Sequence, residues 1–86
     1  MKFMVEFRIK PGGKNSAIEA FELRGPNRIP GVTFRGAWVG ANTDVVFALV
    51  EGADEALVSQ AAQFWTEQPW AQGEHRITPV IDIEQF

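Results

Sequence analysis

The segment 45–51 (VVFALVE) is apolar at every position except the last. Successive side chains of a β-strand point to opposite faces of a sheet, so this pattern is typical of a strand that is covered on both faces. A chain of 86 residues forms one small domain, and its helices can cover only one of these faces. A second subunit is the simplest cover for the other face. The segment therefore predicts a homodimer in which sheet packs against sheet.

The order of elements along the chain is β-α-β-β-α-β. Segments with period-two alternation are separated by Pro, Gly and Asn residues from two segments with helical periodicity. The predicted strands span residues 2–9, 32–39, 45–51 and 76–84. The first helix begins at Ser16, which fits a capping box with Glu19, or one turn earlier, and it stops at Gly25-Pro26. The second begins after an N-cap at Asp54 and ends at Pro69.

This order predicts one α+β domain over residues 1–86 with a ferredoxin-like arrangement. The four-stranded antiparallel sheet has the strand order 4-1-3-2, and both helices lie on one face. Pro79 suits an edge position of the last strand, and Gly36 indicates a bulge or a close backbone approach in the second strand. The helix residues expected to face the sheet are Ala17, Ile18 and Phe21, followed by Leu57, Val58, Ala61, Phe64 and Trp65.

Composition excludes several classes of function. The chain has no Cys and one His, so thiolate metal sites, disulfides and a multi-histidine site within one subunit are excluded. A net charge of −3 argues against binding to DNA or to an anionic membrane. No apolar run approaches the roughly 20 residues that span a bilayer, and the first residues lack a signal-peptide core. We expect a cytoplasmic protein, and no motif predicts a cofactor.

Five segments carry a resemblance to a known family: FMVEFRIKP, GVTFRGAW, FALVE, AAQFW and ITPVIDIE. Together they are similar, over nearly the whole chain, to an uncharacterised bacterial family with a domain-of-unknown-function label (number thirty-three-oh-three). That family is similar to the dimeric α+β barrel superfamily, whose members pair two such sheets into a barrel. The resemblance implies this fold and a homodimer, and it supplies no known activity.

A narrower resemblance concerns the opening MKFM together with Trp65 and His75, which are ten residues apart. Haem-degrading monooxygenases of the same superfamily share this opening and this spacing, and they use an Asn on the first strand. The resemblance implies a haem-degrading enzyme as an alternative function. Phe7 stands where the Asn would be, so the group that contacts the iron-bound ligand is missing.

Glu6 and Arg8 are the main polar break in the first strand and form the centre of the candidate ligand site. Charges on a central strand need partners or a ligand, and Arg is suited to orient a polar or anionic molecule. Candidate partners are Arg35 and Asp82 on the two edge strands, with Arg76 and Thr78 nearby. The proposed ligand is a small, partly aromatic or polar molecule.

Trp38 or Trp70 would form the apolar wall of this site, and His75 would enter from the loop before the last strand as the proton-transfer group. Without a nucleophile, metal cluster or cofactor motif, the chemistry left open is acid–base or cofactor-free oxygen chemistry. A structural module is the alternative. In that case the charges pair within the protein or between subunits, the Trp residues pack in the core, and His75 is an exposed loop residue.

The same element order also builds RNA-recognition modules, which stack bases on aromatic side chains of two strands. In the segment 45–51 the basic lead is replaced by Val45-Val46 and the second aromatic by Leu49. The acidic net charge adds to this mismatch, so RNA binding is the least favoured function.

Overall fold

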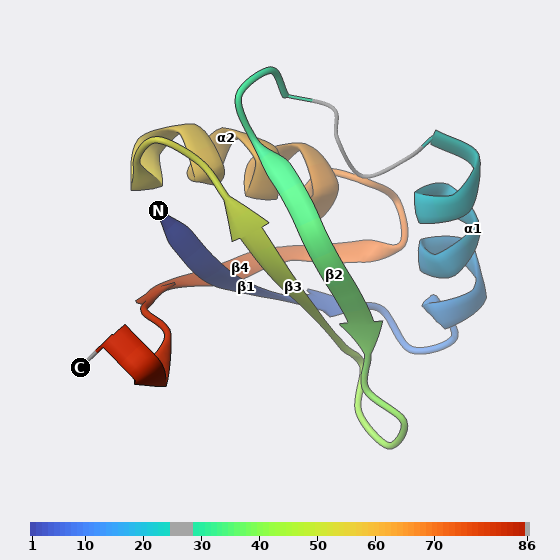
Figure 1. Cartoon of the computed structure of the whole chain (residues 1–86). Helices are drawn as coiled ribbons and strands as arrows, with labels where there is room; N and C mark the ends of the chain where they lie inside the picture. Colours follow the sequence, from blue (N-terminus) through green and yellow to red (C-terminus); the bar gives the residue numbers. More distant parts are fainter. Residues whose placement is uncertain (25–28, 86) are drawn as a thin grey trace.

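The computed structural model describes residues 1–24 and 29–85 and contains all six predicted elements (Figure 1). These are β1 (Lys2–Ile9), α1 (Lys14–Arg24), β2 (Thr33–Val39), β3 (Val45–Glu51), α2 (Glu55–Thr66) and β4 (Ala71–Val80), followed by a short 3₁₀ helix, η1 (Ile83–Gln85). The predicted stop of the first helix at Gly25-Pro26 lies outside the described residues.

The four strands form one antiparallel sheet in the order β2-β3-β1-β4, which confirms the predicted ferredoxin-like topology. β4, which contains Pro79, lies at an edge as expected, because proline has no N–H to donate to a second neighbour. Within the described residues, no helix is long and apolar enough to cross a membrane.

One face of the sheet packs against both helices. Alternate residues of β1 and β3 point toward them and are almost fully buried, as are the inner residues of the helices. The residues of this core that carry most of the packing are Phe3, Val5, Phe7, Ile9, Val46, Ala48, Val50, Ala17, Val58, Ala61 and Trp65. Burying a large apolar side chain contributes about 1.5–3 kcal/mol, so this single layer of contacts accounts for the position of both helices.

The helix ends differ in part from the prediction. Asp54 caps α2 as expected, and its carboxylate accepts a hydrogen bond of 2.9 Å from the Leu57 backbone N–H. α2 ends at Thr66, before Pro69. α1 begins at Lys14, two residues before Ser16, so the earlier of the two predicted starts is closer to the observed one. Ile18 was expected to face the sheet, but 42% of its surface is exposed.

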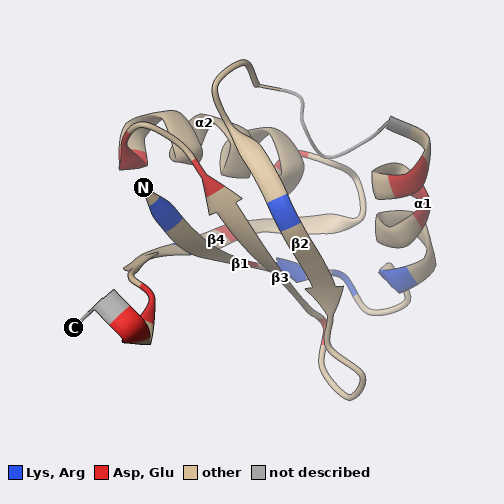
Figure 2. Ribbon diagram, viewed as in Figure 1, with Lys and Arg blue, Asp and Glu red and all other residues tan. Residues whose placement is uncertain are grey.

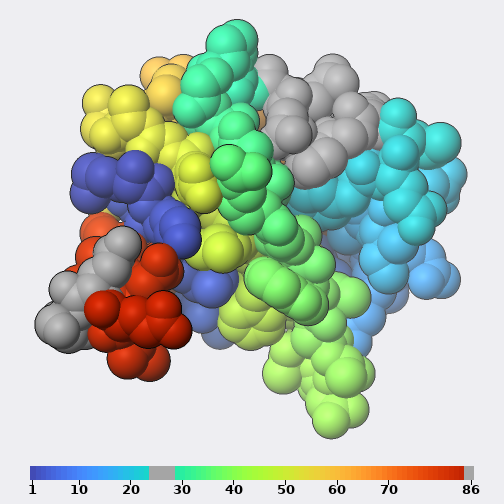
Figure 3. All heavy atoms as spheres, viewed as in Figure 1, coloured from blue at the N-terminus to red at the C-terminus, as the bar shows by residue number. Residues whose placement is uncertain are grey.

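β4 is the element that the sequence predicted least well. It begins at Ala71, five residues before the predicted start at residue 76, and ends at Val80. The backbone pairing with β1 extends through the polar residues 72–76, which an apolar alternation cannot reveal. Beyond the strand, Ile81 and Ile83 are 60% and 86% exposed. This C-terminal segment lies beside the N-terminus (Figure 3), where Lys2 and Asp82 form an ion pair of 3.2 Å.

Candidate functional site

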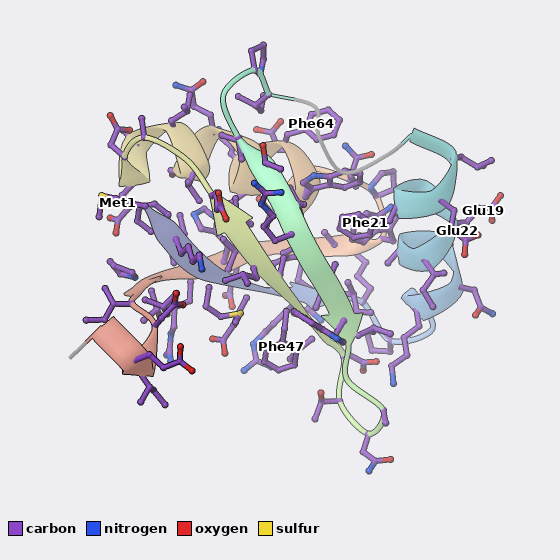
Figure 4. The ribbon with its side chains drawn as sticks, in the orientation of Figure 1. Met1, Glu19, Phe21, Glu22, Phe47 and Phe64 are labelled. Carbon is purple, nitrogen blue, oxygen red and sulfur yellow. The ribbon has the colours of Figure 1, made fainter. Side chains whose placement is uncertain are left out.

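The sheet face that points away from the helices, here called the open face, has no cover within the described residues. Phe47 projects from this face, whereas Phe21 points from α1 into the core on the other side (Figure 4). Val45, Phe47 and Leu49 are only partly buried there, although all three are apolar. The prediction that β3 is apolar on both faces is thus confirmed, and one of these faces is open in the single chain.

Strand register places four side chains of the open face in one row across the sheet. Trp38 on β2 is paired with Phe47 on β3, Phe47 with Glu6 on β1, and Glu6 with Arg76 on β4. Direct cross-strand neighbours lie about 4.5–5.5 Å apart, so the row is continuous. It is aromatic over two strands and charged over the other two, and we call it the amphipathic row.

A bulge in β2 determines how Trp38 lies on the open face. The register shifts between Phe34 and Gly36, so Arg35 is the extra residue. A Cβ atom at Gly36 would lie 2.8 Å from Cη2 of Trp38, so the indole ring covers Gly36 on one side. The ring is still 56% exposed. Gly36 therefore combines the bulge and the close approach that the sequence predicted, and the approaching group is an aromatic ring.

A second irregularity, in β4, lies beside a concavity at the charged end of the row. β1 advances from Phe7 to Ile9 while β4 advances from His75 to Ala71, so β4 has two extra residues here. Gly73 adopts a φ of 82°, a left-handed conformation that favours glycine. The resulting concavity measures about 410 Å³, and its lining residues are Glu6, Phe7, Arg8, Val45, Phe47, Glu74, His75 and Arg76. Bulges of this kind are frequent beside binding sites.

The charges around this concavity lack partners among the described residues. Within residues 1–24 and 29–85, no ion pair or side-chain hydrogen bond engages Glu6, Arg8, Glu74 or Arg76. Acidic and basic residues are spread over strands and helices (Figure 2), so it is the lack of partners, and not an excess of charge, that distinguishes this concavity. These charges are therefore available to a ligand or to a second protein surface.

At the opposite end of the open face, by contrast, the charges are paired. Lys2 contacts Asp82, and the Arg35 guanidinium donates to Glu51 over 3.1 Å from Nε and 3.3 Å from Nη2. The hydrogen bond from Arg35 holds the pKa of the Glu51 carboxyl below its usual value of 4.5. The two ends of one face thus differ in whether their charges are already satisfied.

The structure brings three of the predicted site residues together, namely Glu6, Arg8 and His75. His75 was expected in a loop, but it lies within β4, paired with Phe7. This register turns its side chain toward the helix side of the edge, where it also borders Ser59 of α2. Four of the lining residues were missing from the predicted site, namely Phe7, Val45, Phe47 and Glu74. Only the sheet register and the β4 bulge assign them to it.

The other predicted site residues lie elsewhere. Arg35 and Asp82 are engaged with Glu51 and Lys2, and Asp82 follows β4 instead of lying on it. Trp38 lies on the opposite edge strand, although in the same row. Trp70 lies on the helix side with its ring centroid 6.1 Å from that of Phe7, so it is not a wall of this concavity.

Two positions that the resemblance to haem-degrading enzymes singled out, Phe7 and Trp65, lie in a packed aromatic cluster on the helix side of the sheet. Phe7 is 1% exposed, and Trp65 is fully buried and stacks on Phe21 at 4.3 Å. Trp70 completes this cluster, with its centroid 6.1 Å from that of Trp65. These residues do not fit a haem. The described residues also contain no group of three or more potential metal ligands.

Comparison with known proteins assigns the chain to a family. Residues 1–86 match the family model described as Domain of unknown function (DUF3303). The chain belongs to this family. No curated protein matches its sequence. The resemblance that the sequence motifs indicated is thereby confirmed.

Solved structures show the same fold. An uncharacterized NIPSNAP domain protein from Burkholderia xenovorans is similar with a TM-score of 0.61 and 12% identity, covering 95% of this chain and 94% of that one. The C-terminal domain of the MgtC protein from Mycobacterium tuberculosis is similar with a TM-score of 0.59 and 17% identity, covering 88% of this chain and 83% of that one. A "putative antibiotic biosynthesis monooxygenase" from Chloroflexus aurantiacus J-10-fl is similar with a TM-score of 0.56 and 20% identity, covering 94% of this chain and 93% of that one. The structural likeness shows the fold of the DUF3303 chain. At such low sequence identities it does not show an activity.

Proposed function

We infer that this protein is a homodimer formed through the open face, and that the concavity at Glu6 and Arg8 binds a small molecule with an apolar part and a polar part. The observation that carries the inference is the composition of the amphipathic row. Its aromatic half exposes apolar surface that water solvates poorly, and its charged half has no partners in the part of the chain that the structure describes.

Dimerisation follows from the partly exposed apolar residues of β3. Phe47 and Leu49 lie in the middle of a four-stranded face, and a second copy of the same face would bury them. Glu6, in the same region, would lose water contacts in such an interface. A buried, unpaired charge is costly, so Glu6 then requires a partner from a ligand or from the second subunit.

The ligand class follows from the lining of the concavity. Arg8 and Arg76 offer planar guanidinium groups, which bind carboxylates and other planar polar groups through two parallel hydrogen bonds. Phe47 and Val45 offer apolar surface for the rest of the molecule. The site is therefore suited to a small amphipathic molecule that is aromatic or branched.

A monooxygenase-like activity is the second candidate. It is favoured by the structural likeness to the Chloroflexus protein and by His75, which borders the concavity from the helix side of the sheet edge and could accept a proton from a substrate that extends around β4. Oxygen consumption that depends on an added aromatic acid, and that is lost in His75→Ala, would support this activity. Unchanged oxygen uptake on adding such acids would argue against it.

Two measurements test the main proposal. Sedimentation at micromolar concentration should give the mass of two chains, and native mass spectrometry of the purified protein should detect a bound small molecule. Arg8→Ala should weaken retention of that molecule at least about tenfold, as expected for loss of a charge-assisted hydrogen bond. If Arg8→Ala lowers only stability or dimerisation, the cluster has a structural role.

A further inference from the structure

Trp38 is the exposed aromatic of the amphipathic row, yet it does not line the concavity of its own chain. It lies on the edge strand β2, whereas the concavity is lined by residues of β3, β1 and the opposite edge strand β4. Three inter-strand spacings of about 4.8 Å separate the two edges, or roughly 14 Å. Phe47 and Val45 supply apolar surface on one side of the concavity, so a second apolar wall, over Arg76, must come from another molecule.

The geometry of a symmetric dimer determines what lies opposite Trp38. Two open faces can be related by a two-fold axis that is parallel to the strands and runs between β3 and β1. This axis places β2 of one copy over the partner's β4, and β3 over the partner's β1. The aromatic half of each row then faces the charged half of the other. Trp38 then faces the partner's Arg76, and Phe47 faces the partner's Glu6. Both contacts occur twice because the axis is two-fold.

A two-fold axis perpendicular to the strands is less compatible with the charges. On the amphipathic row itself, it would set Glu6 on the partner's Glu6 and Arg76 on the partner's Arg76, and like charges in contact are unfavourable. If this axis were shifted along the strands, the amphipathic row would face Lys2 and Glu51 of the partner subunit. The charges of these two residues are already paired with Asp82 and Arg35. Avoidance of like-charge contacts therefore favours the axis parallel to the strands, in which the Glu6 carboxylate is left to the bound ligand.

We propose that in the dimer the indole ring of Trp38 stacks on the guanidinium of the partner's Arg76 and forms the outer wall of the partner's concavity. This rests on the homodimer inferred above. The ring is suited to this contact because one of its sides lies on Gly36 while much of its surface remains exposed. Guanidinium groups stack on Trp more favourably than on other side chains, and Arg76 has no other partner among the described residues.

The test uses two variants that each lack one half of the contact. Trp38→Ala removes the ring, and Arg76→Gln removes the guanidinium; both residues are exposed, so both variants should fold. When the two variants are mixed and allowed to exchange subunits, only the heterodimer contains one intact Trp38–Arg76 contact. Native mass spectrometry separates the three dimers by mass.

The proposal predicts that the heterodimer exceeds the half expected for random pairing and reaches about three quarters of all dimers. That fraction corresponds to a roughly tenfold shift of the exchange equilibrium. Because the exchange forms two heterodimers, this is about threefold for each contact, in the range of an exposed cation–π contact. Random pairing of dimeric variants would overturn the contact while leaving the dimer intact, whereas a monomeric wild-type protein would overturn the dimer itself.

Arg8→Gln is the matched control. Under the same axis, Arg8 faces the partner's Val45 and not Trp38, so Arg8→Gln mixed with Trp38→Ala should pair at random. A preference for the heterodimer in this mixture, together with none in the Arg76→Gln mixture, would assign Trp38 to a different guanidinium and overturn the proposal.

Discussion

The indole ring of Trp38 lies against Gly36, the residue two positions earlier on the same strand, so closely that a Cβ atom at Gly36 would approach Cη2 to 2.8 Å. Side chains at i and i+2 of a strand share a face, and here the absence of one side chain makes room for the other. The bulge at Arg35 and the ring on Gly36 together determine the shape of the open face at the β2 edge.

Gly36→Ala is expected to displace the ring. The contact is shorter than two carbon atoms tolerate, so Trp38 must rotate away, and the protein should lose roughly 1–2 kcal/mol of unfolding free energy. Urea denaturation measures the loss. The same substitution in a Trp38→Ala background should cost much less, and an equal cost in both backgrounds would show that the backbone of the bulge, not the ring, requires glycine.

Neighbouring positions of β3 should respond differently to a charge. Val46 is 3% exposed and faces the helices, so Val46→Asp should abolish folding, because an uncompensated charge in the core costs several kcal/mol. Phe47 lies on the open face, so Phe47→Asp should leave a folded monomer with native circular dichroism. Sedimentation distinguishes the two results. A Phe47→Asp protein that remains dimeric would exclude the open face as the interface.

The Arg35–Glu51 pair predicts a pH dependence of stability. Arg35 lowers the pKa of Glu51 in the folded state below 4.5, so the pair stabilises the protein at pH values above that and loses its contribution as the pH falls through the lowered pKa. Glu51→Gln should therefore reduce stability at neutral pH and narrow its difference from the wild type in acid. Urea midpoints at neutral and acidic pH test this; a constant difference would contradict it.

Removal of the α2 cap should destabilise the domain without affecting the open face. Asp54→Ala deletes the acceptor for the Leu57 N–H, which typically costs about 1 kcal/mol. Asp54→Asn retains an acceptor oxygen and should recover most of this loss. Thermal unfolding measures both. Dimerisation, followed by sedimentation, should be the same in all three proteins, since α2 lies on the other side of the sheet.

Local pattern was sufficient for most of the fold. The alternation in β1, the helical stripe of α2 with its Asp54 cap, and the edge position of Pro79 all follow from side-chain periodicity and backbone chemistry, which act within a few residues. The apolar character of both faces of β3 could also be predicted from the sequence, because alternate residues of a strand point to opposite faces of the sheet.

The candidate site depended on the tertiary structure. Glu6 and Arg8 could be singled out as charges on a central strand, but the residues beside them depend on the register between β1 and β4 and on two extra residues in β4. Polar residues such as Glu74 and His75 remain exposed in any register, so the hydrophobic pattern of the sequence does not indicate how they pair with β1. Only the pairing of strands distant in sequence places them at the concavity and leaves Trp38, in the same row, at the far edge.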